Sequence, residues 1–324
     1  MSGSAAWPTS EVGGDDAEAF LVEEPELRLA TVATALHGQR LDKVLVTLAP
    51  EFSRSHLQNL VAAGHVRVAG RVVDVSSSKV RAGESIELSL VPTAERQAFR
   101  AEPLPIVIVH EDAHLMVINK RAGWVVHPAA GNWSGTLLNA LLAHHRQAAS
   151  LPRAGIVHRL DKDTSGLMVV AKSLAAFTGL SRAIAERSVH REYLAIAHGE
   201  VAVQPYTIDA PIGRDPRVRV RMAVVAQGKA ARTDIARLAL KDGLSALNCK
   251  LHTGRTHQIR VHLASTGHPL VGDVLYGGRL ELGLQRQALH AARLAFEHPI
   301  SAQRLNMEVA APPDFEQAWA RIAG

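Results

Sequence analysis

The chain has 324 residues, 47% of them hydrophobic, which is enough apolar material for more than one buried core and predicts two domains. Its longest apolar runs are far shorter than the roughly 20 residues needed to cross a bilayer, so no membrane span is expected. The N-terminus lacks a secretory signal pattern and Cys249 is the only cysteine, so a reducing cytoplasm is the expected compartment.

The formal net charge of +5 is unevenly distributed along the chain. Residues 1–27 hold seven acids and no Lys or Arg, so the remaining 297 residues carry a charge of +12. The acidic segment is rich in Gly, Ser and Ala and has no sustained period, which predicts a disordered tail. The basic remainder would suit a polyanion such as nucleic acid, although a solvated basic surface explains it equally well.

Residues 38–91 have the pattern of a small helix-helix-hairpin module. The first helix is predicted by the i, i+3, i+4, i+7 spacing of Leu41, Val44, Leu45 and Leu48. Ser53 can cap a second helix that ends at Gly64. A hairpin turning at Ala69-Gly70 and a strand over 85–90 complete the module.

The polar face of this module is basic, through Arg40, Lys43, Arg54, His56, Arg67, Arg71 and Lys79. Three segments (Arg-Leu-Asp-Lys-Val-Leu, Ser-Arg-Ser-His-Leu-Gln-Asn-Leu and Gly-His-Val-Arg-Val-Ala-Gly-Arg-Val-Val) resemble the RNA-binding domain named after ribosomal small-subunit protein four. The resemblance implies that Lys43, Arg54, Arg67 and Arg71 contact RNA. A charged surface on a small helical domain remains the alternative.

Residues 92–103 have the composition of a linker, and 104–324 form the second predicted domain. Short strands are predicted over 106–109, 115–118, 168–171, 193–197, 235–240 and 244–251, with a hairpin turn at Asp242-Gly243. Helices are predicted over 136–145, 174–187 and 257–265. The class is therefore α+β, with a mixed, mainly antiparallel sheet and a central cleft.

The segment His-Arg-Leu-Asp-Lys-Asp-Thr-Ser-Gly, residues 158–166, is the first candidate for chemistry. Asp161 precedes a turn-forming group and then a buried strand, where a side chain is held rigidly. Arg159 and Lys162 favour its ionised form, as a nucleophile or base. Asp163 is interpreted as a hydrogen-bond acceptor of the turn. Two residues apart in an extended segment, the carboxylates would point in opposite directions, unlike the facing pair of a glycoside hydrolase.

Other chemistries find little support in the sequence. There are 17 histidines, but His257 and His262 are five residues apart, whereas chelating pairs on a helix favour a spacing of four. A single cysteine cannot build a sulfur site, so no metal is expected. No phosphate-binding glycine loop, dinucleotide fingerprint or serine-hydrolase elbow is present.

Two further segments accompany Asp161. Tyr193 lies in Arg-Glu-Tyr at the start of a predicted strand. Residues 253–263 place a glycine turn before a helix for which Thr256 is the expected cap, and the cations at this helix start would suit an anion. Taken singly, Tyr193 could be a core aromatic and Arg260 a surface charge.

In this order, Pro-Arg-Ala-Gly-Ile-Val-His-Arg-Leu-Asp-Lys-Asp-Thr-Ser-Gly-Leu, Arg-Glu-Tyr and Thr-Gly-Arg-Thr-His-Gln-Ile-Arg-Val-His-Leu resemble the RluA-type family of pseudouridine synthases. The likeness covers roughly residues 38–318. It implies conversion of uridine in RNA to pseudouridine without a cofactor, with Asp161 as the catalytic carboxylate. It also implies that Tyr193 stacks on the uracil and helps to take the C5 proton, and that Arg260 pairs with Asp161.

The same resemblance implies that Arg159 supports the position left by a flipped-out base, and that His158, Lys162, Arg255 and His257 contact the substrate. The run 127–132, the run 135–141 and the N-terminal module are similar to the subgroup that modifies clustered uridines in a stem-loop of large-subunit (23S) ribosomal RNA. A monomer is expected. Alternatives are uridines of other ribosomal or transfer RNAs, a non-catalytic RNA-binding assembly factor, and a glycosidase that releases uracil.

Overall fold

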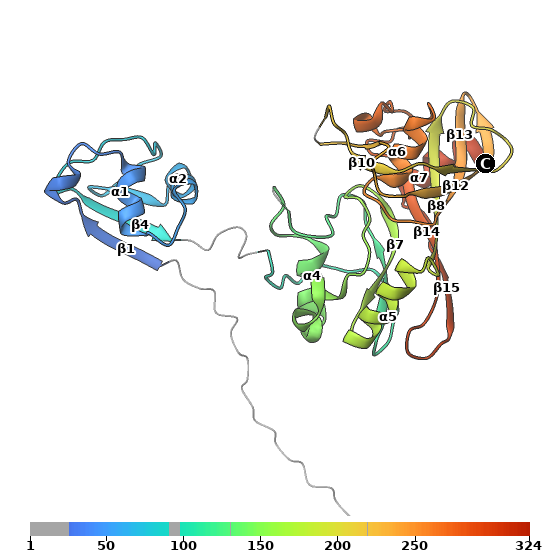
Figure 1. The fold of residues 1–324 in the computed structure, drawn as a ribbon, viewed down its shortest axis with the longest axis horizontal. Helices are drawn as coiled ribbons and strands as arrows, with labels where there is room; N and C mark the ends of the chain where they lie inside the picture. Colours follow the sequence, from blue (N-terminus) through green and yellow to red (C-terminus); the bar gives the residue numbers. More distant parts are fainter. Residues whose placement is uncertain (1–25, 91–97, 130, 219) are drawn as a thin grey trace, which may run out of the picture. The chain divides into compact units, whose positions relative to one another are not determined.

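A computed structural model describes residues 26–90, 98–129, 131–218 and 220–324. The chain divides into two compact units, residues 1–93 and 94–324, and Figure 1 draws the described part of the first in blue to cyan and that of the second in blue-green to red. The division falls inside the segment that composition suggests as a linker. Each unit has its own sheet and its own buried core.

The first unit packs two helices on a four-stranded sheet of order β1-β4-β2-β3. Its elements are β1 Glu26–Thr31, α1 Leu41–Leu48, α2 Arg54–Ala62, β2 Val66–Val68, β3 Arg71–Val72 and β4 Ser85–Leu90. Leu41, Leu45 and Leu57 are fully buried between the layers. Ser53 accepts a hydrogen bond from the backbone N–H of His56 at 3.2 Å, which confirms the predicted cap.

Strand β1 corrects the predicted limit of the acidic tail. The tail was expected to run through residue 27, but Glu26 and Leu27 pair with Leu90 and Ser89 of β4. The remainder of that prediction, residues 1–25, lies outside the described residues. This edge strand escaped notice because its short alternation of acidic, basic and apolar side chains follows directly on an acidic segment.

The second unit is built on a nine-stranded sheet of order β5-β6-β7-β14-β8-β13-β12-β9, with β15 paired to β14. Only β7 and β14 are parallel, and the other pairs in this sheet are antiparallel, as the sequence predicted. The strands are β5 Ile108–Glu111, β6 Leu115–Lys120, β7 Ser165–Ala171, β8 His190–His198, β9 Tyr206–Asp209, β12 Arg232–Lys241, β13 Leu244–Leu251, β14 Leu289–Glu297 and β15 Arg304–Glu308. A separate two-stranded sheet is formed by β10 Ile212–Arg214 and β11 Met222–Val224.

The helices of this unit are α4 Leu137–His144, α5 Leu174–Ala185, α6 Gln258–Ser265 and α7 Pro313–Ala323. The first three confirm predicted helices. Strand β14 and helix α7 were missed. Strand β14 reads Leu-His-Ala-Ala-Arg-Leu-Ala-Phe-Glu, and its alanines and charges give it weak strand propensity although it lies in the interior of the sheet.

The linker prediction needs a correction in its second half. Residues 92–97 lie outside the described residues, but residues 98–103 pack on the second unit. The side-chain amide of Asn139 donates to the carbonyl oxygens of Ala98 (3.2 Å) and Arg100 (2.8 Å), and Ala98 is buried. This part of the segment therefore belongs to the second unit, because Asn139 in the first turn of α4 donates its hydrogen bonds.

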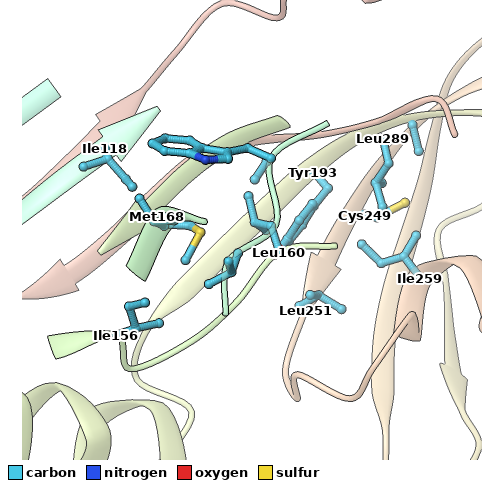
Figure 2. Close-up of a cluster of buried hydrophobic side chains, with 14 of the residues drawn as sticks. Ile118, Ile156, Leu160, Met168, Tyr193, Cys249, Leu251, Ile259 and Leu289 are labelled. Carbon is cyan, nitrogen blue, oxygen red and sulfur yellow. The ribbon is translucent and has the colours of Figure 1, made fainter. Parts of the chain in front are cut away.

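The largest core cluster of the second unit lies next to the Asp161 segment. Figure 2 shows the ring of Tyr193 beside Leu160, with Leu251, Ile259 and Leu289 on the neighbouring elements. Leu160 is only 4% exposed, so the residue before Asp161 is anchored in this core. Burial of one leucine side chain contributes about 1.5–3 kcal/mol, which is enough to hold a loop against the sheet.

Candidate active site

The chain approaches Asp161 through a backbone segment that is pinned to β7. Gly155 has a φ of +83°, and a Cβ at this position would collide with the carbonyl oxygen of Ala171. Ile156 forms a β-bridge with Val170, the residue before Ala171 in the same strand. The close backbone approach explains why a glycine stands here. This contact with β7 fixes the position of the backbone that leads to Asp161.

A tight turn over residues 161–164 then holds the Asp161 backbone. The N–H of Thr164 donates to the carbonyl of Asp161 at 3.2 Å, and Arg286 Nη1 donates to the carbonyl of Asp163 at 2.9 Å. The sequence interpretation gave the Asp163 side chain the acceptor role, but these contacts use backbone carbonyls. Ser165 pairs instead with His290 Nδ1 at 3.0 Å. The turn is therefore held largely by side chains from elsewhere in the unit.

The carboxylate of Asp161 faces two cationic or potentially cationic groups. Arg260 Nη1 donates to Asp161 Oδ2 at 3.1 Å, which is the pairing that the family resemblance implied. His257 Nε2 lies 3.9 Å from Oδ1. The Asp161 side chain is 16% exposed, so the carboxylate is partly withdrawn from water. Coulombic attraction to the guanidinium is stronger in such a partly buried site than between groups in bulk water.

Asp273 is the functional-site residue that the sequence reasoning missed. Its carboxylate takes a forked pair of hydrogen bonds from Arg260, Nε to Oδ2 at 2.7 Å and Nη2 to Oδ1 at 2.9 Å. Both residues are buried, and the Arg260 guanidinium carbon lies 5.0 Å from the centre of the Tyr276 ring. Asp273 thus fixes the orientation in which Arg260 meets Asp161. In the sequence, Asp273 ends the segment Pro-Leu-Val-Gly-Asp, residues 269–273, to which no role was given.

His257 stands at the junction between the glycine turn and α6. Thr256 was expected to cap this helix, but the position before the helix is His257, in the left-handed conformation with φ 57°. The turn is closed by the side chain of Gln258, whose Oε1 accepts from the N–H of Arg255 at 3.0 Å and from Thr253 Oγ1 at 2.7 Å. His257 Nδ1 is within 2.8 Å of the Tyr276 hydroxyl. This arrangement turns the imidazole towards Asp161.

Tyr193 forms an apolar wall of the Asp161 cavity. It is 5% exposed and lines this cavity together with Leu251, Ile259 and Leu289. Burial raises the pKa of its phenol to about 12, and the charge of Asp161 acts in the same direction. At neutral pH the hydroxyl keeps its proton in the free protein. The environment therefore favours the implied stacking role over the implied role as a proton acceptor.

Lys120 supports the same turn from the interior of the unit. It is fully buried, and its Nζ donates to the carbonyls of Arg121, Trp124 and Lys162, each at 2.9 Å. Burial lowers its pKa to about 7, although Asp163 and Asp161 oppose the shift. The contact with Lys162 ties β6 to the turn over residues 161–164.

Replacing Lys120 by Met is expected to lower the free energy of unfolding by about 3 kcal/mol, because one buried and two partly buried carbonyls lose their donor. Urea unfolding measures the change. The exposed Lys241→Met on β12 serves as the control and should shift stability by less than about 0.5 kcal/mol. Equal stability of the two variants would contradict the assigned role of Lys120.

His158 was expected to contact the substrate, and one of its two ring nitrogens holds the fold. Its Nε2 accepts the N–H of Val169 at 3.0 Å, and its Nδ1 is buried. Burial, aided by the positive charge of Arg191, lowers the pKa of His158 to about 3. A neutral ring that accepts a backbone hydrogen bond is suited to a structural role. Contact with RNA through this residue stays a prediction.

The lowered pKa of His158 predicts acid sensitivity. Between about pH 6.5 and 3 the unfolded chain binds a proton that the folded chain excludes, so the free energy of unfolding should fall as the pH drops through this window. His158→Gln should lose part of that slope, measured by urea unfolding at pH 7.5, 6 and 5. His190→Gln, an exposed histidine of the same unit, should keep it. An unchanged slope in His158→Gln would refute the interpretation.

The structure brings together most of the predicted site residues in the second unit. Asp161, Tyr193, Arg260, Arg159, Arg255 and His257 line one cavity, and Lys162 lines a second cavity that also reaches Asp161. In the first unit, Lys43, Arg54, Arg67 and Arg71 are exposed. Arg54 pairs there with the buried Asp42 at 2.9 Å, and Arg40 and Gln58 donate to the same carboxylate. RNA contact by these four residues stays a prediction.

Within the described ranges, no group of three or more His, Cys, Asp or Glu side chains is placed to hold a metal ion. In that same part of the chain, no helix is long and apolar enough to span a membrane.

Comparisons with known proteins identify the family. Residues 114–265 match the family model of RNA pseudouridylate synthases, and residues 39–86 match the S4 domain. Ribosomal large subunit pseudouridine synthase D of Nitrosomonas europaea is 46% identical over 318 residues, which is 96% of this chain and 90% of that protein. Its counterpart in Xanthomonas campestris pv. campestris is 43% identical, over 92% of this chain and 93% of that protein.

Among solved structures, human RNA pseudouridylate synthase domain containing 1 is 29% identical and superposes with a TM-score of 0.53, over 70% of this chain and 89% of that one. Its likeness concerns the same fold that carries Asp161. The identity to the bacterial relatives extends over nearly the whole chain, S4 domain included. The chain therefore belongs to the RluA-type family of RNA pseudouridine synthases.

Proposed function

We propose that this protein isomerises uridine to pseudouridine in large-subunit (23S) ribosomal RNA, at clustered uridines of one stem-loop, with Asp161 as the catalytic carboxylate. The target is supported by the relatives, which are named ribosomal large subunit pseudouridine synthase D. The role of Asp161 is supported above all by its 3.1 Å contact with a guanidinium that Asp273 orients. That pairing places the carboxylate beside a guanidinium and an apolar wall.

The reaction conserves every atom and electron of the substrate, so the residues need only move bonds and protons. In one route an Asp161 oxygen attacks C1′ and the bond from C1′ to N1 breaks, with uracil leaving as an anion. The ring rotates, C5 attacks C1′, the bond to Asp161 breaks, the C5 proton leaves and N1 is protonated. In the other route the carboxylate removes the C2′ proton while the bond from C1′ to N1 breaks, which gives a glycal and the uracil anion. C5 then bonds to C1′ as the proton returns to C2′, the C5 proton leaves and N1 is protonated. Both need an ionised Asp161.

The remaining residues divide between binding and orientation. Tyr193 offers its buried ring to the uracil face, and Arg159 lies on the exposed side of the cavity, where it can occupy the place of a flipped-out base. The four basic residues of the S4 domain would hold flanking RNA through phosphate contacts.

We further infer that the protein acts in the cytoplasm as a monomer. The sequence offers no second cysteine with which Cys249 could form a disulfide within the chain, in keeping with a reducing compartment.

The test uses the purified full-length protein with transcripts of large-subunit ribosomal RNA and of transfer RNA. Carbodiimide-dependent stops in reverse transcription should appear at a few neighbouring uridines of the ribosomal transcript and not in the transfer RNA. Stops confined to transfer RNA would overturn the target, and their absence from every RNA would favour a non-catalytic assembly factor. Release of free uracil would instead identify a glycosidase.

A further inference from the structure

A third cavity, of about 380 Å³, adjoins the cavity that Asp161 and Tyr193 line. These two cavities share Arg159, Arg191, Gly254 and Arg255. The third cavity is also lined by Arg153, Arg187, His127 and His158, and its lining contains no aspartate or glutamate. Five arginines without an acid among them make a strongly positive recess next to the catalytic carboxylate.

The arginines of this recess are not neutralised by partners elsewhere. No ion pair joins Arg153, Arg159, Arg187, Arg191 or Arg255 to an acid among the residues that the structure describes. Arg191 is only 5% exposed, and its Nε is buried without a hydrogen-bond partner within that same set. Burying a charged donor in this way costs free energy unless a ligand completes the site.

Two histidines in the lining also have a buried ring nitrogen without a hydrogen-bond partner among the described residues. Four buried side-chain nitrogens of the described chain lack a partner, and three of them, His127 Nε2, His158 Nδ1 and Arg191 Nε, belong to this cavity. Since His158 Nε2 accepts a backbone N–H and its ring is neutral, the proton must lie on Nδ1. His158 Nδ1 and Arg191 Nε are therefore both donors without acceptors.

The backbone at the rim of the cavity has a left-handed conformation at two of its arginines. Arg153 has a φ of 52° and Arg187 a φ of 64°, in the region that residues other than Gly and Asn seldom adopt. At Arg187 this conformation ends helix α5, where the N–H of Ser188 donates to the carbonyl of Ala183 at 2.9 Å. Both residues are exposed arginines at the cavity.

We propose that this recess, defined by Arg153, Arg187, Arg191 and His158, binds a phosphodiester group of the RNA strand that flanks the target uridine. A phosphate offers only acceptor oxygens, which matches the buried donors, and its charge matches the arginines. The shared Arg159 and Arg255 place this phosphate next to the nucleotide at Asp161. The inference rests on the proposed function, because the phosphate belongs to that RNA.

The experiment removes the phosphate charge and the arginine separately and together. From the large-subunit transcript, the tightest-binding stem-loop is synthesised with a single uncharged methylphosphonate at each linkage in turn. Its affinity for the full-length protein is measured by fluorescence anisotropy. At one linkage the parent protein should lose about tenfold in affinity, and Arg191→Gln should lose about tenfold with unmodified RNA. Arg191→Gln should lose nothing more at that linkage.

Arg182→Gln, an exposed arginine of α5 outside the cavity, is the matched control and should show the full loss at that linkage. Arg187→Gln at the rim repeats the test if Arg191→Gln does not fold. Losses that add at every linkage in both variants would overturn the proposal. Affinity is read independently of turnover, so a protein that forms no pseudouridine would defeat the proposed function while leaving this test intact.

Discussion

Asp161→Asn should lower the rate of pseudouridine formation by at least about 10³-fold, because an amide can neither attack C1′ nor accept a proton from the sugar. The amide has nearly the same shape, and Arg260 stays anchored by Asp273, so the fold and the RNA affinity should change little. Single-turnover pseudouridine formation and anisotropy with labelled RNA measure the two quantities. A variant that binds RNA and does not turn over is the expected result.

Asp163→Asn is the matched control, because it changes a carboxylate two residues away in the same turn. The backbone carbonyl of Asp163, which accepts from Arg286, is untouched by the substitution. Activity should therefore stay within a few-fold of the parent. Equal inactivation of both variants would contradict the assignment of a single working carboxylate and would revive a paired mechanism.

Asp273→Asn should destabilise the second unit by about 3–5 kcal/mol, because it leaves the buried Arg260 without its forked counter-charge. Arg260 should then also lose its orientation towards Asp161, so turnover should fall even where the variant is folded. Urea unfolding gives the first quantity, and single-turnover rates at a temperature where the variant is folded give the second. The two losses together distinguish positioning from stability alone.

Glu281→Gln provides the control for this charge change. Its ion pair with Arg279 is largely exposed, with 72% of the arginine side chain and 34% of the glutamate side chain accessible. Exposed pairs contribute about 0–1 kcal/mol, so this variant should behave like the parent. If Asp273→Asn were equally harmless, the contact with Asp161 alone would orient Arg260, and Asp273 would not be a positioning residue.

The sequence was sufficient for the elements whose pattern is strong. The helices of the S4 domain have clear apolar spacing, and β13 was predicted at its full length, 244–251. Strand β14 was not found although it is in the interior of the sheet, because alanine and charged residues give no strand signal until neighbours bury them. Helix α7, with Phe315, Ala318 and Ile322 buried, carried an apolar spacing that was overlooked.

The sequence by itself determined the family, since the ordered motifs around Asp161, Tyr193 and Arg260 resemble those of RNA pseudouridine synthases. Only the tertiary structure decided how Asp161 is held. Lys120, Asp273 and Arg286 lie 41, 112 and 125 positions from it in the chain. No spacing rule relates such distant residues. They meet because folding buries their charges, and a buried charge is stable only where donors and acceptors from other segments converge on it.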